Sequence, residues 1–129
     1  MKHLFPLRVY YEDTDLAGIV YYANYLKFIE RARSEWVRAL GVDQTRMKAD
    51  HDLVFAVRRV EADYLRPAVF DDELIVETSL KSISAARIVL QQNVKRADEL
   101  LFASVVTLVA LTSSGRPTRL PADVRQNLS

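Results

Sequence analysis

The chain has 129 residues, half of them apolar (50%), and its 18 Lys and Arg nearly balance its 17 Asp and Glu. This length suits a single domain over residues 1–129, and the balanced charge argues against a nucleic-acid-binding protein, which normally has a basic excess. The absence of cysteine excludes disulfides, thiolate metal sites and cysteine nucleophiles, and it favours a cytoplasmic location.

The N-terminal residues predict a strand over about residues 5–11. Pro6 and Arg8 interrupt its apolar residues, so the stretch is too short for the core of a signal peptide. No run in the chain approaches the roughly 20 apolar residues that a membrane-spanning helix needs. We therefore expect no membrane span.

One long amphipathic helix is expected over residues 23–40. Its apolar residues recur at spacings of three and four, which places them on one stripe of the helix surface. Gly41 stands where a left-handed C-terminal cap would lie, and a weaker helical turn is expected over residues 43–48. The apolar stripe consists of Tyr25, Phe28, Ile29, Ala32, Trp36, Val37 and Leu40.

From residue 53 onward the apolar residues alternate, which predicts strands. The first of these strands changes phase at Arg58 and Arg59, which indicates a bulge, and it ends by Pro67. Further strands are expected over residues 72–82, 87–96 and 101–111, with a turn at 97–99. The last strand is apolar on both faces, as expected of a central strand covered on both sides. A short helix over residues 122–127 follows Pro121.

This order of elements predicts an α+β fold, in which a five-stranded antiparallel sheet wraps around one long central helix. One helix cannot cover both faces of such a sheet. Apolar sheet surface is therefore expected to be buried by a partner subunit, so we expect a homo-oligomer, either a dimer or a tetramer.

The segment with chemical potential is residues 9–25, VYYEDTDLAGIVYYANY, where Asp13 and Asp15 follow the first strand and Gly18 precedes the helix. A helix start presents unpaired N–H groups and a positive dipole end, which can stabilise a developing oxyanion. A nearby carboxylate can attack a carbonyl or activate water, so the set suffices for acyl transfer or hydrolysis. On spacing alone, capping of a turn or of the helix explains the two aspartates more simply.

The longer segment 9–38, VYYEDTDLAGIVYYANYLKFIERARSEWVR, resembles the signature of 4-hydroxybenzoyl-CoA thioesterase-like hotdog proteins. It is most similar to their YbgC-like branch, which in bacteria is associated with the Tol-Pal gene cluster. Residues 60–72, VEADYLRPAVFDD, also resemble that branch. The resemblance implies a hotdog fold and an acyl-CoA thioesterase that releases a free acid and coenzyme A, and it implies no metal or redox cofactor.

By this resemblance, Asp15 is the catalytic carboxylate, acting as nucleophile or as general base on water. The backbone N–H of Tyr22 is the expected oxyanion donor, and Gly18 lets the loop pass close to the thioester. Many YbgC-like sequences carry a histidine where this chain has Tyr22. The backbone donor survives that change, whereas an acid or base role for the side chain, and the acyl preference, stay open.

Coenzyme A carries phosphates, which lysine or arginine should bind. The candidates are Arg58, Arg59, Lys81 and Arg87. Arg87 leads because, in the wider family, basic residues from the fourth-strand region hold the nucleotide, often across a subunit boundary. The alternative is that arginines at strand rims are merely solvated.

The remaining aromatic and histidine residues are expected to have ordinary roles. His3 and His51 show neither metal nor catalytic spacing, and we expect both at the surface, His51 in a loop. Trp36 is expected in the core. Five tyrosines around the motif are expected to form walls and core: Tyr10, Tyr11, Tyr21, Tyr22 and Tyr25.

Two functions other than hydrolysis stay open. The same pocket could bind acyl-CoA or acyl-carrier protein without turnover, which a hydrolysis assay with free-thiol detection would reveal. The chain could instead be a structural partner of an envelope complex, as the gene-cluster association of the resembling branch suggests, and a pull-down from membrane extracts addresses this.

Overall fold

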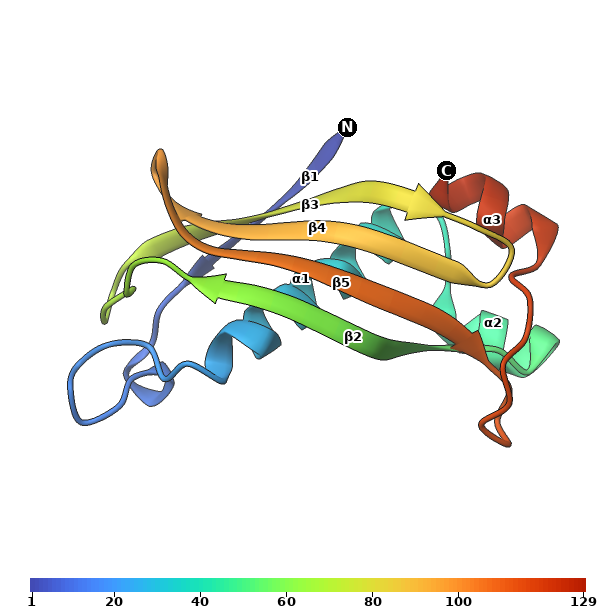
Figure 1. Ribbon diagram of the computed structural model, residues 1–129, viewed down its shortest axis with the longest axis horizontal. Helices are drawn as coiled ribbons and strands as arrows, with labels where there is room; N and C mark the ends of the chain where they lie inside the picture. The colour runs from blue at the N-terminus through green and yellow to red at the C-terminus, as the bar shows by residue number, and fades with distance from the viewer.

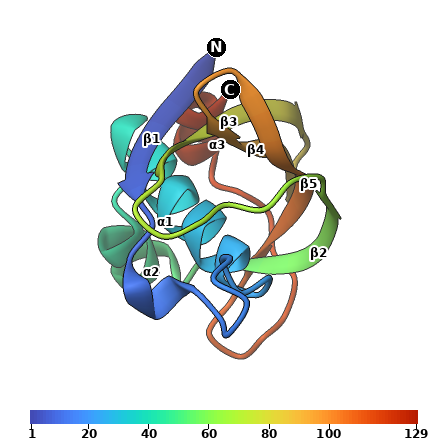
Figure 2. The same cartoon turned by 90° about the vertical axis from the view of Figure 1, so that its left-hand side faces the viewer.

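The computed structural model describes residues 1–129 and contains one curved antiparallel sheet with a long helix on its concave side (Figure 1). The strands lie in the order β1-β3-β4-β5-β2. Viewed nearly along the helix, the sheet passes over it from β1 on one side to β2 on the other (Figure 2). The elements are β1 (Lys2–Arg8), a 3₁₀ turn η1 (Tyr11–Asp13), α1 (Asn24–Ala39), α2 (Gln44–His51), β2 (Val54–Tyr64), β3 (Glu73–Ile83), β4 (Arg87–Arg96), β5 (Glu99–Leu111) and α3 (Ala122–Leu128).

The helix α1 confirms the amphipathic pattern. Its predicted apolar stripe is buried, except for Leu40, which caps the helix and is exposed. Gly41 follows with a φ of +82°, the left-handed conformation that favours glycine after a helix. The predicted turn at 43–48 is a longer helix, α2, because the carboxylate of Asp43 accepts a hydrogen bond from the Arg46 N–H and caps it.

The strand predictions hold best where alternation is regular. The pairing of β2 with β5 shifts between Val57 and Arg59, which confirms the predicted bulge. The pairing of β3 with β4 shifts between Leu80 and Ser82, which the alternating pattern did not reveal. None of the helices combines the length and apolar character that crossing a membrane requires.

The first strand was misplaced by the sequence pattern. It covers residues 2–8 rather than 5–11, because the carboxylate of Asp13 accepts the Tyr10 N–H at 2.8 Å and turns the chain into η1. An acidic side chain three residues ahead therefore ends the strand, although the apolar residues continue.

The last strand is not covered on both sides within the chain. β5 lies between β4 and β2, so β4 is the central strand of the sheet. Alternate residues of β5, such as Val106 and Leu108, are buried on the side of α1, whereas Val105 and Val109 on the opposite side are only half-buried. The reason is that the single long helix lies on one face only, as Figure 2 shows.

A polar network is buried between α1 and the sheet. Gln92 is fully buried, and its amide nitrogen donates to the Ile29 carbonyl and to the Thr78 hydroxyl, both at 2.9 Å. Its amide oxygen accepts from Arg33 at 3.0 Å, and its backbone carbonyl accepts from the Ser104 hydroxyl at 2.7 Å. Burial lowers the pKa of Arg33, against the raising effect of Glu30. We call Gln92 and its four hydrogen-bond partners, Ile29, Arg33, Thr78 and Ser104, the Gln92 network.

Candidate active site

The two aspartates of the motif have different surroundings. Asp13 is half-buried, and one oxygen of its carboxylate accepts the Tyr10 N–H. Its backbone carbonyl accepts from the Tyr21 N–H and from the Asn24 side-chain amide, both at 2.9 Å. Asp13 therefore joins the end of β1 to the start of α1. This is the structural role expected of an aspartate that caps a turn.

Asp15 lies in an exposed loop closed on itself by a bridge between Thr14 and Val20. Its backbone N–H donates to the Ile19 carbonyl and its carbonyl accepts from the Gly18 N–H, each at 2.9 Å. One carboxylate oxygen accepts the Ala17 N–H at 2.9 Å, and the other has no hydrogen-bond partner in the protein. Asp15 thus presents a carboxylate oxygen available to a ligand or to water.

Gly18 is placed in this loop by its backbone conformation. Its φ of +81° is one that L-residues rarely adopt, and a Cβ atom there would meet nothing within 4 Å. Within the chain, the glycine is therefore required by the turn and not by close packing.

The backbone at the start of α1 includes an unpaired donor. The N–H of Tyr22, two residues before the first residue of α1, makes no hydrogen bond to any protein group, while its carbonyl accepts from the Tyr64 hydroxyl at 3.1 Å. Unpaired N–H groups at a helix start can hold negative charge. The same short loop thus presents a free carboxylate oxygen and a free amide donor.

A row of aromatic rings leads from the core to this loop. Phe102 stacks on Tyr25 at 5.0 Å, Tyr25 contacts Tyr64 at 5.6 Å, and Tyr64 contacts Tyr22 at 6.1 Å. Tyr21 lies 4.9 Å from Tyr22, and the neighbouring phenol of Tyr22, with a weaker contribution from the charge of Asp15, raises the pKa of Tyr21. Tyr25 is buried and the other tyrosines of the row are exposed, so they can form a wall beside Asp15.

Sequence reasoning did not single out Tyr64. It is the last residue of β2 and the only residue whose side chain donates to the backbone at Tyr22. The tyrosine in the segment VEADYLRP was the available signal. Its role depends on a contact 42 positions away in the chain, which alternation along β2 cannot reveal.

The three arginines nominated for coenzyme A lie away from Asp15 in the same chain. Arg87 opens β4 and Arg96 ends it, and a strand of that length spans about 30 Å. The Asp15 loop lies at the Arg96 end of the sheet (Figure 1). Arg58 and Arg59 occupy the bulge of β2, both exposed, and Arg59 pairs with Glu61 at 3.0 Å. The structure therefore does not bring these arginines together with Asp15 in one chain.

Arg87 has basic neighbours that sequence reasoning missed. Ala85, two residues earlier, accepts the Leu120 N–H at 2.7 Å, and Arg119 and Arg125 line a hollow of about 340 Å³ beside it. The guanidinium groups of Arg87, Arg119 and Arg125 form no ion pair with a carboxylate. Unpaired arginines near the β3–β4 turn provide positive charge for an anionic ligand.

The two histidines differ from their expected environments. His51 is exposed as expected, but it is the last residue of α2 and not part of a loop. His3 lies on β1 opposite Thr78, where it is half-buried and its Nδ1 atom is buried without a hydrogen-bond partner. His3 lies near the terminus but is not at the surface, because it is paired with the buried Thr78 of β3.

Known proteins match both the sequence and the structure. Residues 9–128 match the family described as the thioesterase-like superfamily. The acyl-CoA thioesterase YbgC of Haemophilus influenzae is 39% identical over 123 residues, which cover 94% of this chain and 90% of that protein.

Two solved structures share the fold. A probable thioesterase from Bartonella henselae has a TM-score of 0.90 at 35% identity, covering 94% of this chain and all of that one (100%). A 4-hydroxybenzoyl-CoA thioesterase variant complexed with 4-hydroxybenzoyl-CoA has a TM-score of 0.93, with 99% of each chain covered. At 22% identity, this second likeness concerns the fold alone.

Proposed function

Because this chain belongs to the thioesterase-like superfamily and is a hydrolase of the YbgC-like acyl-CoA thioesterase type, we propose that Asp15 is its catalytic carboxylate. The family resemblance and the hotdog fold expected from the sequence are both confirmed by these matches. One observation carries the proposal: the exposed carboxylate of Asp15 has an oxygen without a protein partner in the loop that leads to the unpaired Tyr22 N–H, whereas Asp13 is half-buried and its carboxylate closes the turn that ends β1.

In the proposed reaction, the Tyr22 N–H donates to the carbonyl oxygen of the thioester as negative charge develops on it. The carboxylate of Asp15 either attacks the carbonyl carbon and expels the coenzyme A thiolate, or removes a proton from the water that attacks. In the first route, water then hydrolyses the mixed anhydride. Both routes consume one water and release one acid and one thiol.

The function is tested with a panel of short, long and aromatic acyl-CoAs and detection of the free thiol. We expect release of the thiol from at least one of these classes, with an equal amount of free acid. A protein that binds the substrates but releases no thiol would be a binding module instead.

We also propose that the active form is a homo-oligomer. The face of β5 away from α1 is only half-buried, and apolar side chains around the Asp15 loop are exposed, with Leu16 at 105% and Tyr22 at 61% of full exposure. Leaving such surface in water costs about 25 cal/mol for each Å² of apolar area. We expect light scattering at micromolar concentration to give at least twice the chain mass of 14.8 kDa. A species of 14.8 kDa would contradict this.

Arg87 is proposed to bind the nucleotide of coenzyme A. Because it lies at the opposite end of the sheet from the Asp15 loop of its own chain (Figure 1), this role implies that the substrate reaches the Asp15 loop of a partner subunit. The unpaired Arg119 and Arg125 nearby support an anion site at this end.

We expect Arg87→Ala to raise KM roughly tenfold, because a hydrogen bond to a charged group contributes about 1.5–3 kcal/mol, and to leave kcat unchanged. The defect should disappear with a minimal thioester that lacks the nucleotide. Arg31→Ala is the matched control, an exposed arginine of α1 without an ion pair. A lower kcat at saturation, or an equal defect with both substrates, would assign Arg87 another role.

A further inference from the structure

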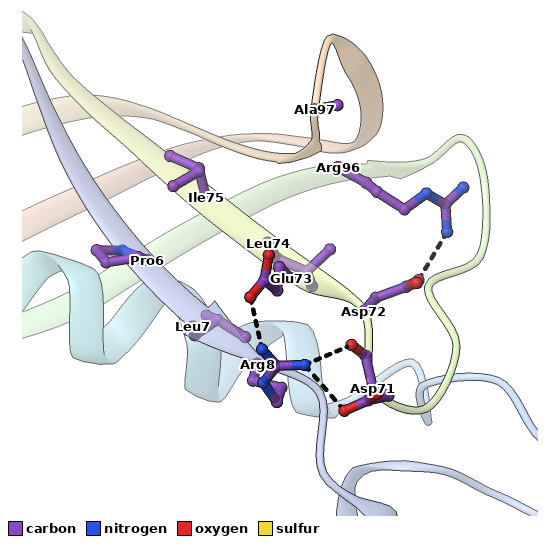
Figure 3. A pocket seen from close by; sticks show the side chains of 10 residues that line it. All are labelled: Pro6, Leu7, Arg8, Asp71, Asp72, Glu73, Leu74, Ile75, Arg96 and Ala97. Atoms are coloured by element: carbon purple, nitrogen blue, oxygen red, sulfur yellow. Dashed lines mark hydrogen bonds and ion pairs between the residues drawn. The ribbon is translucent and has the colours of Figure 1, made fainter.

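A surface hollow of about 840 Å³ lies apart from Asp15. It lies where β1, β3 and β4 meet the segment before β3, and Figure 3 shows its charged side chains paired with one another. Arg8 donates to the Asp71 carboxylate at 2.9 Å and to Glu73 at 2.5 Å, and Arg96 donates to Asp72 at 2.7 Å. Two arginines thus pair with three carboxylates, and these ion pairs join β1 and β4 to the residues around the start of β3.

They hold the segment between β2 and β3, residues 65–72, which supports the Asp15 loop. The Val20 N–H donates to the Ala68 carbonyl at 2.9 Å, and Ile19 and Val69 form an antiparallel bridge. On the other side, the Ala68 N–H donates to the buried hydroxyl of Tyr25 on α1 at 3.1 Å. Residues 65–72 therefore contact both the loop that carries Asp15 and the helix that follows it.

Asp72 joins this segment to the sheet. One of its carboxylate oxygens accepts both the Val69 N–H at 2.8 Å and the Arg96 guanidinium at 2.7 Å. Val69 also forms the bridge to Ile19, so the hydrogen bond between Val69 and Asp72 holds the residue that contacts the Asp15 loop.

Arg96 contacts this segment at more than one point. Besides Asp72, it donates to the Pro67 carbonyl at 3.4 Å and to Glu99 at 2.5 and 3.2 Å. The side chain of Asp72 is only 17% exposed and that of Arg96 is 31% exposed. Such a partly sheltered, multiply bonded arginine is held more firmly than the arginine of an exposed surface pair.

We propose that Arg96 is a positioning residue for the reaction: by holding Asp72, it fixes residues 65–72 and thereby the loop that carries Asp15. This inference rests on the proposed function of Asp15. The Asp15 loop is exposed and is joined to residues 65–72 by the contacts of Ile19 and Val20. The position of residues 65–72 therefore determines where the carboxylate of Asp15 lies. A misplacement of about 1 Å can lower a rate by as much as a hundredfold.

The test compares Arg96→Met with Arg96→Lys, and with Arg38→Met as the matched control. Arg38 also pairs with a glutamate three positions away, but it lies exposed on α1. We expect Arg96→Met to lower kcat roughly tenfold and to change KM less than about twofold. Arg96→Lys should retain kcat within about threefold, because a lysine keeps a charged hydrogen bond to Asp72. Arg38→Met should behave as the wild type.

Hydrogen–deuterium exchange gives a readout that does not depend on activity. In Arg96→Met, the peptides covering residues 66–72 and 13–20 should exchange faster than in the wild type, while those from β4 and β5 should not. Should Arg96→Met fail to fold, Asp72→Asn is the second variant: an asparagine still accepts the Val69 N–H but loses the charged hydrogen bond to Arg96, so the same pattern is expected.

The outcomes separate the two proposals. Unchanged exchange over residues 13–20, or faster exchange with an unchanged kcat, overturns the positioning role of Arg96. If the wild type hydrolyses no acyl-CoA, the proposed function fails, and faster exchange in both peptides still supports Arg96 as the residue that fixes the Asp15 loop.

Discussion

Asp15→Asn is expected to lower kcat by roughly a hundredfold or more, the effect of removing a nucleophile or general base, while the protein stays folded. An asparagine can still accept the Ala17 N–H that Asp15 accepts at 2.9 Å, so the loop keeps its shape. It loses the negative charge that attacks a carbonyl carbon or removes a proton from water. Steady-state kinetics with the best acyl-CoA of the panel, together with circular dichroism, measures both parts of this expectation.

The matched variant is Asp13→Asn, two residues earlier in the same motif. Asparagine is as good a cap as aspartate, so the hydrogen bond from Tyr10 should persist. We expect Asp13→Asn to keep most of the activity, with a modest loss of thermal stability. A nearly normal rate in Asp15→Asn and an inactive Asp13→Asn would reverse the assignment of the two aspartates.

Sequence patterns predicted those features whose cause lies within a few residues. The spacing of three and four residues between apolar side chains predicted α1, and the change of phase at Arg58 and Arg59 predicted the bulge of β2. Both patterns depend only on residues that are close together in one helix or strand. The end of β1 was missed, since the apolar residues continue past the point where Asp13 turns the chain.

The candidate site was predictable only in part, for a related reason. Asp15, Gly18 and Tyr22 lie within eight residues of one another in a recognisable motif. The contacts that support them join distant positions: Tyr64 donates to Tyr22 across 42 residues, and Arg96 to Asp72 across 24. Ion pairs and hydrogen bonds between strands depend on the register of the sheet, and a sequence pattern does not specify which partner a surface charge finds.

The Gln92 network shows the same limit inside the core. Gln92 lies in β4 on the face that alternation assigns to the core, and a polar side chain there conflicts with the simple pattern. The structure explains it, because the amide contacts a strand neighbour, Thr78, and two groups of α1, the Ile29 carbonyl and the Arg33 guanidinium. Buried polar groups of this kind are tolerated when their partners are supplied.

We therefore expect Gln92→Leu to lower the free energy of unfolding by about 2–4 kcal/mol. Leucine has nearly the volume of glutamine, so the change leaves no large cavity, but it removes the partner of Arg33 and of the Thr78 hydroxyl. A buried donor or acceptor left without a partner costs about 1–3 kcal/mol, and more when it is charged. Arg33 has no carboxylate partner that could replace the lost hydrogen bond.

Urea denaturation at one fixed protein concentration measures the change, because subunit association would otherwise shift the midpoint. Gln91→Leu is the matched control: it makes the same substitution one residue earlier, on the opposite, half-buried face, where the Gln91 amide donates only to Asn93 at 3.0 Å. We expect it to change stability by less than about 1 kcal/mol. Equal stability of Gln92→Leu and the wild type would mean that the added apolar contact of leucine offsets the lost hydrogen bonds, and that α1 is held on the sheet by its apolar stripe alone.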